Sequence, residues 1–161
     1  MPETKEKEIK FRLTPIANGT VLDHLPVGSA PKLVNLLDLD VSSGAITIAI
    51  NTESKDGRER KDLLFIENME LTPIDLEKIG LIAHGSTWNL IKNKQVVHKQ
   101  KIPLPSQVKG VMHCQNPICI TNAEPITTQF VILEKPLEAV CYYCERTISE
   151  KDLLSSLKWA K

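Results

Sequence analysis

Polar and hydrophobic residues alternate along several short segments of the chain, as they do in strands that bury one face. The segment Lys7–Ile16 shows this alternation, and a turn at Asn18–Gly19 separates it from a second extended segment, Thr20–Leu25. The more continuously apolar segment Ala45–Asn51 predicts a buried strand, and Lys61–Asn68 predicts a further extended segment. Successive side chains of a strand point to opposite faces of a sheet, so these segments indicate one sheet in the first part of the chain.

Two segments repeat their apolar residues at helical spacing and begin with residues that favour a helix start. The first begins at Ser29, which is placed as an N-cap and is followed by a proline in the first turn. The second begins with Thr72 as the cap, Pro73 at the first helical position and Asp75 in the positively polarised first turn. A third, amphipathic helix is expected in the tail, Ser149–Lys161.

The order of these elements predicts the fold class. After the second helix, Ser86–Ile91 and Gln95–Lys99 flank a polar turn and indicate a hairpin. A sheet carrying two helices on one face is an α+β, ferredoxin-like arrangement. Two prolines in 102–107 end the last strand and suggest a linker. We therefore expect an α+β domain over 1–101 and a small antiparallel β domain over 102–161.

The four cysteines of the chain form two close pairs, Cys114-x4-Cys119 and Cys141-x2-Cys144. Each short pair can turn two sulfurs toward one point, and the segment between the pairs can fold back to complete a tetrahedron. Four thiolates are one of the standard ligand sets of structural zinc. The spacing therefore predicts one structural zinc ion per chain in the second domain, which is too small for a large core of its own.

Other uses of these cysteines fit the sequence less well. Two disulfides would need an oxidising compartment, and the N-terminal residues lack the apolar segment of a secretory signal. A redox pair at Cys141 and Cys144 would leave the first pair unexplained. A catalytic zinc is disfavoured because four thiolates leave no open coordination position, whereas iron in a four-thiolate site stays an open alternative.

Composition and charge narrow the function classes. The 20 basic and 20 acidic residues give a formal net charge of zero, and the first cysteine knuckle (112–122) contains no Lys or Arg. Both observations disfavour a zinc-ribbon nucleic-acid-binding module with an accessory α+β domain, which stays the alternative. No apolar run approaches the roughly 18 residues of a membrane span. We expect a cytoplasmic, non-enzymatic protein that binds neither nucleic acid nor membrane.

Several short motifs occur together in a fixed order. The segments Thr20–His24, Arg60–Leu63 and Ile66–Asn68 precede the hairpin near Val96–Val97 and the two cysteine pairs, and Asn122–Pro125 follows the first pair. In this order they resemble the regulatory chain of aspartate carbamoyltransferase, from about Ile9 to about Ser149. The joint order of the motifs carries the resemblance, because paired cysteines alone occur in many zinc-binding domains.

The resemblance implies a non-catalytic, allosteric subunit in pyrimidine biosynthesis. Chains of this family bind nucleotides, namely CTP, UTP and ATP, in the N-terminal domain. They contact the catalytic chain of aspartate carbamoyltransferase through the zinc domain. They also pair through their N-terminal sheets, and three regulatory dimers bridge two catalytic trimers in a dodecamer.

The resemblance also implies an effector site. Asp23 corresponds to an acid that contacts the ribose, His24 to a histidine near the phosphates, and Lys99 to a lysine that binds the triphosphate. The remaining positions line the pocket: Leu13 beside the base, Asn89, Val96, and Lys94, which replaces a tyrosine of some members.

One position departs from the family pattern. Family members often carry a lysine that points at the base and sugar, where this chain has Phe65. A phenyl ring can stack on a base, but it cannot donate a hydrogen bond to a carbonyl or a hydroxyl. The sequence therefore predicts weaker discrimination between bases.

Overall fold

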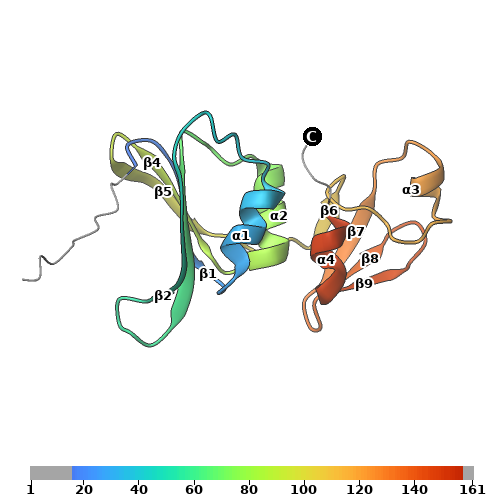
Figure 1. The fold of residues 1–161 in the computed structure, drawn as a ribbon. Coiled ribbons are helices and arrows are strands. Elements are labelled where there is room, and N and C mark those ends of the chain that lie inside the picture. Colours follow the sequence, from blue (N-terminus) through green and yellow to red (C-terminus); the bar gives the residue numbers. More distant parts are fainter. Residues whose placement is uncertain (1–15, 158–161) are drawn as a thin grey trace, which may run out of the picture.

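The computed structural model of this 161-residue chain describes residues 16–157, which form two small antiparallel sheets with helices between them (Figure 1). The strand predicted over 7–16 lies outside the described residues except for Ile16. The first part of the chain contains β1 (Gly19–Leu25), α1 (Ser29–Leu36), β2 (Ile46–Glu53), β3 (Arg60–Glu67), α2 (Pro73–Ala83), β4 (Thr87–Lys92) and β5 (Gln95–Lys101).

The five strands pair antiparallel in the order β2-β3-β1-β4-β5, and α1 and α2 cover one face of the sheet (Figure 1). This order is the split βαβ arrangement of ferredoxin-like folds, extended by β5, and it confirms the predicted α+β class. Alternation along the central strands places Leu22, Leu64 and Ile66 in the core under the helices. Val21 and Phe65 pair with each other on the opposite, outer face.

The two helices begin in different ways. At α2, Thr72 accepts a hydrogen bond from the Asp75 N–H (3.2 Å) and the Asp75 carboxylate accepts one from the Thr72 N–H (2.9 Å), which confirms the predicted cap. At α1 the N-cap is Gly28, and Ser29 donates its hydroxyl to the Pro26 carbonyl instead. The predicted serine cap is therefore wrong. The buried Asp62 carboxylate of β3 accepts from the Gly28 N–H (2.8 Å) and the Ala30 N–H (3.2 Å) in its place.

The strand predicted to be buried, β2, lies at the edge of the sheet. Its side chains Ile48 and Ile50 are 39% and 51% exposed. An apolar run predicts that a strand is buried, but it does not show the position of that strand in the sheet. In α2, Ile79 is buried, whereas Ile74 is 54% exposed.

The second sheet has the order β6-β7-β8-β9 and is antiparallel throughout, which confirms the predicted small β domain. Its elements are β6 (Gln107–Lys109), α3 (Ile120–Ala123), β7 (Gln129–Leu133), β8 (Glu138–Cys141), β9 (Thr147–Ser149) and α4 (Glu150–Ser156). The predicted tail helix is thus confirmed over 150–156, and residues 158–161 lie outside the described part.

The helices α1 and α2 lie between the first sheet and the second domain, with α4 next to them (Figure 1). The linker after β5 packs closely on α2, since a Cβ on Gly80 would lie 2.4 Å from the Pro103 carbonyl oxygen. Ile102 is fully buried and pairs its backbone with Ser86 and Gly85. No helix within residues 16–157 is both long enough and apolar enough to span a bilayer.

Candidate metal centre and ligand-binding face

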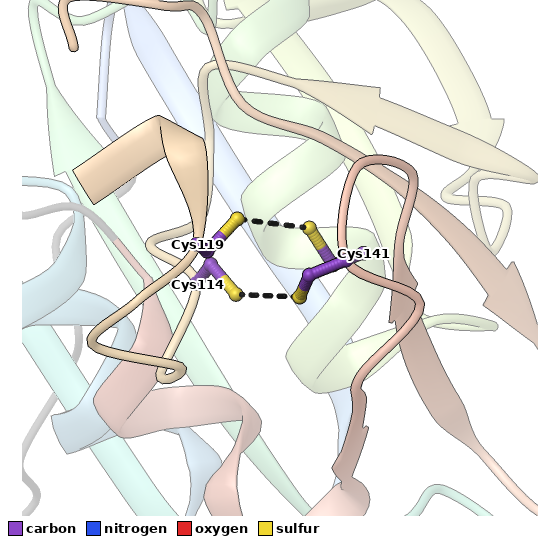
Figure 2. A group of neighbouring side chains, drawn as sticks. Cys114, Cys119 and Cys141 are labelled. Carbon is purple, nitrogen blue, oxygen red and sulfur yellow. Dashed lines mark hydrogen bonds between the residues drawn. The ribbon is translucent and has the colours of Figure 1, made fainter. Parts of the chain in front are cut away.

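Two loops of the second domain bring the four cysteine sulfurs together, and Figure 2 shows the two pairs facing each other. The first loop precedes α3, and the second connects β8 to β9. The sulfur ligand atoms all lie within 4.8 Å of one another. The Cys114 and Cys144 sulfurs are 3.5 Å apart, and the Cys119 and Cys141 sulfurs are 3.9 Å apart.

Local hydrogen bonds fix the shape of both loops. In the first loop, the Asn122 side chain donates to the carbonyls of Cys114 (2.9 Å) and Asn116 (2.7 Å), and the Thr121 hydroxyl donates to the Cys119 sulfur (3.2 Å). In the second loop, the Cys141 N–H donates to the Arg146 carbonyl (3.0 Å). Bonds to more distant segments add to these, since the His113 N–H donates to the Ser156 carbonyl (2.7 Å) and the Tyr142 N–H donates to the Gln129 carbonyl (2.9 Å).

The arrangement fits a tetrahedral metal ion. Four sulfurs at about 2.3 Å from a central zinc lie about 3.8 Å from each other, close to the two separations above. None of the four cysteines forms a disulfide, because the distances between their sulfur atoms exceed the roughly 2.05 Å of a disulfide bond. Three of them are buried, so a closed structural site fits better than an open catalytic one.

The thiols differ in acidity. Burial raises the pKa of the Cys114 thiol to about 12. At Cys144, desolvation also acts to raise the pKa, but hydrogen bonds from the Arg146 backbone and the Asn116 side chain outweigh it and lower the pKa to about 7. A metal must displace the thiol protons to bind all four sulfurs, so metal affinity should increase with pH.

The outer face of the first sheet, opposite the helices, carries two neighbouring cavities. The first has a volume of about 320 Å³ and is lined mainly by apolar side chains of the strands and the preceding segment: Ile16, Val21, Phe65, Asn89, Ile91, Lys94 and Val96. The second has a volume of about 360 Å³ and is lined by charged and polar side chains: Asp23, His24, Ser54, Lys55, Asp56, Glu59, Lys61 and Lys99.

These cavities adjoin because their lining residues are neighbours in the sheet. Val21 and Asp23 lie two residues apart on β1, a separation of about 7 Å. Asn89 pairs with Val21 on one side and with Lys99 on the other. An apolar cavity and a charged cavity therefore lie next to each other on one face.

An ion pair organises the charged cavity. The Lys61 ammonium lies 2.8 Å from an Asp23 carboxylate oxygen, and both side chains are largely buried, at 14% and 28% exposure. The Asp23 carboxylate also accepts the His24 N–H at 2.6 Å. Desolvation acts to raise the pKa of Asp23, but the hydrogen bonds from Lys61 and His24 outweigh it, so the pKa lies below its usual value.

The structure thus divides the effector residues that the sequence suggested between these two cavities. Asp23, His24 and Lys99 line the charged cavity, whereas Asn89, Lys94 and Val96 line the apolar one. Leu13 lies outside the described residues. Sequence reasoning missed Lys61, although period-two spacing from Phe65 along β3 would have placed it on the same face.

A ferredoxin-like sheet joined to a small β domain with a four-cysteine cluster defines a two-domain, metal-binding chain. Two family models match it in that order. Residues 11–103 match "Aspartate carbamoyltransferase regulatory chain, allosteric domain", and residues 106–154 match the metal binding domain of the same chain. The chain belongs to the family of aspartate carbamoyltransferase regulatory chains.

Relatives along nearly the whole length carry the same name. The regulatory chain of Pyrococcus horikoshii is 40% identical over 98% of this chain and 100% of its own length. That of Methanopyrus kandleri is 40% identical over 90% of this chain and 94% of its own length. That of Ignicoccus hospitalis is 42% identical over 91% of this chain and 95% of its own length. These names confirm that the chain is a regulatory, non-catalytic subunit, and the second family model shows that it has a metal-binding domain.

Proposed function

We propose that this chain regulates aspartate carbamoyltransferase by binding nucleotides at the outer face of its first sheet and by docking the catalytic chain through its zinc domain. In this assignment 1–101 is the effector domain, and 102–161 is the zinc domain. The metal is zinc, bound by Cys114, Cys119, Cys141 and Cys144. The effectors are CTP, UTP or ATP, and the chain acts in the cytoplasm.

Exposed apolar side chains beside the metal centre support the docking role. Ile118, at the tip of the first knuckle, is 88% exposed, and Tyr142, in the second loop, is 62% exposed. Exposed aliphatic and aromatic residues next to a rigid centre are typical of the core of a protein interface. The metal would hold these loops in the shape that the partner recognises.

Metal analysis combined with co-purification tests this role. Purified chain should contain about one zinc per chain, and Cys119→Ser should lose it and unfold the second domain. Such sites contribute on the order of 10–16 kcal/mol, which exceeds the stability of a small domain. Zinc removal should abolish binding of the catalytic chain while the first sheet stays folded. A chain that still binds its partner after zinc removal would contradict the role of the metal.

A matched pair of surface variants tests the docking surface separately from the metal. Ile118→Asp should weaken binding to the catalytic chain without changing the zinc content. Val41→Asp is the control, because Val41 is similarly exposed (78%) but lies in the first domain. Equal effects of the two variants would assign docking to another surface.

The pairing of an apolar and a charged cavity supports the nucleotide role. A base suits the apolar cavity, and phosphates suit the lysines and the histidine of the charged one. Calorimetric titration with ATP, CTP and UTP should detect binding, and Lys99→Ala should weaken every nucleotide by about tenfold or more through the loss of one charge-assisted hydrogen bond. The exposed Lys109 of β6 gives the control variant, Lys109→Ala. Absence of binding at millimolar nucleotide would refute this role.

The exposed edge of the first sheet supports self-association as a regulatory dimer within a dodecamer. Within residues 16–157, β2 is an edge strand that carries the exposed Ile48 and Ile50, and a strand edge of this kind is a natural site for pairing. Light scattering should give the mass of a dimer for the free chain and that of a monomer for Ile50→Lys. A monomeric parent chain would remove this part of the assignment.

A further inference from the structure

The strand β3 lies between β1 and β2, and each of these two neighbours carries a β-bulge beside it. The pairing register of β1 with β3 shifts at Asp23 and His24, and the register of β2 with β3 shifts at Ile50 and Asn51. His24 and Asn51 both have left-handed backbone angles, with φ of 56° and 57°. Residues other than glycine populate this conformation sparsely, and a bulge changes the direction of the side chains on its strand. The two bulges therefore flank the same short part of β3.

The bulge in β1 connects the charged cavity to the start of α1. Its Asp23 carboxylate forms the 2.8 Å ion pair with Lys61 inside that cavity and accepts the His24 N–H. After the bulge, a single turn leads from the end of β1 to Gly28, the N-cap of α1. The ion pair and the start of the helix thus lie at the two ends of one short segment.

The side chain of Asp62 joins both bulges to the start of α1 from the other face of the sheet. One carboxylate oxygen accepts from the Gly28 and Ala30 N–H groups, and the other accepts from the Asn51 N–H, which belongs to the bulge in β2. The side chain is fully buried, and all three donors are backbone groups. Because a packed interior leaves little free space, the carboxylate cannot move without moving at least one of these segments.

The helix α1 lies on the side of the first sheet that faces the second domain (Figure 1). Its Lys32 lines a cavity of about 290 Å³ together with side chains of α2 and α4, among them Leu81 and Leu153. Lys32 is about one helical turn from the start of α1. A change at the start of α1 is therefore close to the boundary between the two domains.

An anionic ligand in the charged cavity would compete with the bulge for Lys61. Phosphate oxygens form charge-assisted hydrogen bonds with ammonium groups, as the Asp23 carboxylate does. The carboxylate and the phosphate carry charges of the same sign, and they repel each other in a cavity where both partners of the ion pair are largely buried. A phosphate that binds Lys61 therefore displaces Asp23, whose backbone is part of the bulge.

We propose that the two bulges and Asp62 form a hinge that carries occupancy of the charged cavity to the start of α1; this regulation rests on the nucleotide-binding function proposed above. Phosphates displace Asp23 from Lys61, the bulge in β1 rearranges, and the N–H groups that bind Asp62 change their surroundings. Such coupling requires that the ligand favour one of two arrangements of the hinge. The ion pair defines one arrangement, and its loss defines the other.

Heteronuclear NMR spectra of the full-length, zinc-loaded chain test the hinge without any ligand. Asp23→Ala removes the ion pair and should shift the amide signals of Gly28 and Ala30 beyond the range of shifts in the second domain. The Asp75 amide at the start of α2 should keep its position, because its capping box is local. This signal also verifies that the variant is folded. Unchanged signals of Gly28 and Ala30 would overturn the proposal.

The matched control is Asp56→Ala. Asp56 lines the same cavity, so its removal changes the charge of the cavity by the same amount, but its carboxylate binds Ser54 and Arg58 of its own loop. We expect this variant to leave the Gly28 and Ala30 signals in place. Equal shifts in the two variants would show that cavity charge rather than the bulge moves these signals, and would overturn the proposal.

Titration of the parent chain with ATP separates the hinge from the binding site. The amide signals of Lys55 and Lys99 report occupancy of the cavity, and those of Gly28 and Ala30 should shift at the same ATP concentrations, in the direction that Asp23→Ala shifts them. Shifts confined to the cavity would overturn the hinge while the nucleotide-binding function stands. If no signal shifts at millimolar ATP, the nucleotide-binding function is overturned, and the comparison of Asp23→Ala with Asp56→Ala decides the hinge by itself.

Discussion

The buried carboxylate of Asp62 provides a sharp test of how the first domain is held together. Asp62 is fully buried in β3, and its two oxygens accept from three backbone N–H groups. One oxygen binds Gly28 and Ala30 at the start of α1, and the other binds Asn51 (2.9 Å) in β2. The change Asp62→Asn keeps the size of the side chain but leaves it only one oxygen.

The cost of this change follows from the three donors. In its best orientation the new amide retains the oxygen toward Gly28 and Ala30 and turns its NH2 group toward the Asn51 N–H. One charge-assisted hydrogen bond, worth about 1.5–3 kcal/mol, is then lost, and a buried donor is left unpaired. The negative charge near the N-terminus of α1 is lost as well, for about 0.3–1 kcal/mol. We expect Asp62→Asn to lower the free energy of unfolding by about 2–4 kcal/mol.

Urea denaturation followed by tryptophan fluorescence measures this cost. The change Trp159→Phe in all proteins makes Trp88 of β4 the only fluorophore of this kind, so the signal reports on the first sheet. The control is Asp38→Asn, because Asp38 is exposed and the substitution removes the same charge. We expect the free energy of unfolding of this control to stay within about 0.5 kcal/mol of that of the parent chain.

A competing effect sets the condition for refutation. Removing a buried charge also removes its desolvation penalty, which can make such a substitution neutral or stabilising. We expect the hydrogen bonds to dominate, because backbone donors fixed by the fold cannot rotate to find other partners. Equal stability of Asp62→Asn and the parent would show that desolvation balances the three bonds and that this reasoning is wrong.

Two further predictions concern the ion pair and the linker. The pKa of Asp23 is lowered in the folded chain, so its contribution to stability should be complete above about pH 4 and should disappear as the pH falls through the folded pKa. Urea denaturation midpoints measured between pH 5 and pH 2 should therefore fall less in Lys61→Met than in the parent chain. Gly80→Ala should lower the melting temperature, because the added Cβ would lie 2.4 Å from the Pro103 carbonyl oxygen. Overpacking of this kind costs about 1–3 kcal/mol, against a gain of roughly 1 kcal/mol in helix propensity. An unchanged or raised melting temperature would contradict the close contact.

The features that the sequence predicted well depend on local chemistry. The capping box of α2 needs only Thr72 and Asp75, three residues apart on one turn. The two cysteine pairs are similar, since each knuckle is closed by hydrogen bonds within a few residues of its own sulfurs. Local spacing is sufficient in both cases because the groups that interact are close in the chain.

The features that the sequence did not predict depend on contacts between distant segments. Ser29 has the residue type of an N-cap, but a carboxylate 32 residues or more away in the chain takes that role at α1. The strand β2 has the apolar character of a buried strand, but its place at the sheet edge is set by the pairing order. No pattern within either segment contains this information.

The outer face of the first sheet shows the same limit, and the pairing of its strands supplies what the sequence pattern lacks. Lys61 and Asp62 are adjacent in β3, so their side chains project to opposite faces. Lys61 pairs with Asp23 on the outer face, whereas Asp62 holds α1 on the helix side. The alternation of side chains along β3 is enough to place Lys61 and Asp62 on opposite faces of the sheet. Only the pairing of β3 with β1 shows that the partner of Lys61 is Asp23. Since one strand carries both contacts, displacement of Asp23 from Lys61 would act on the residue next to the anchor of α1.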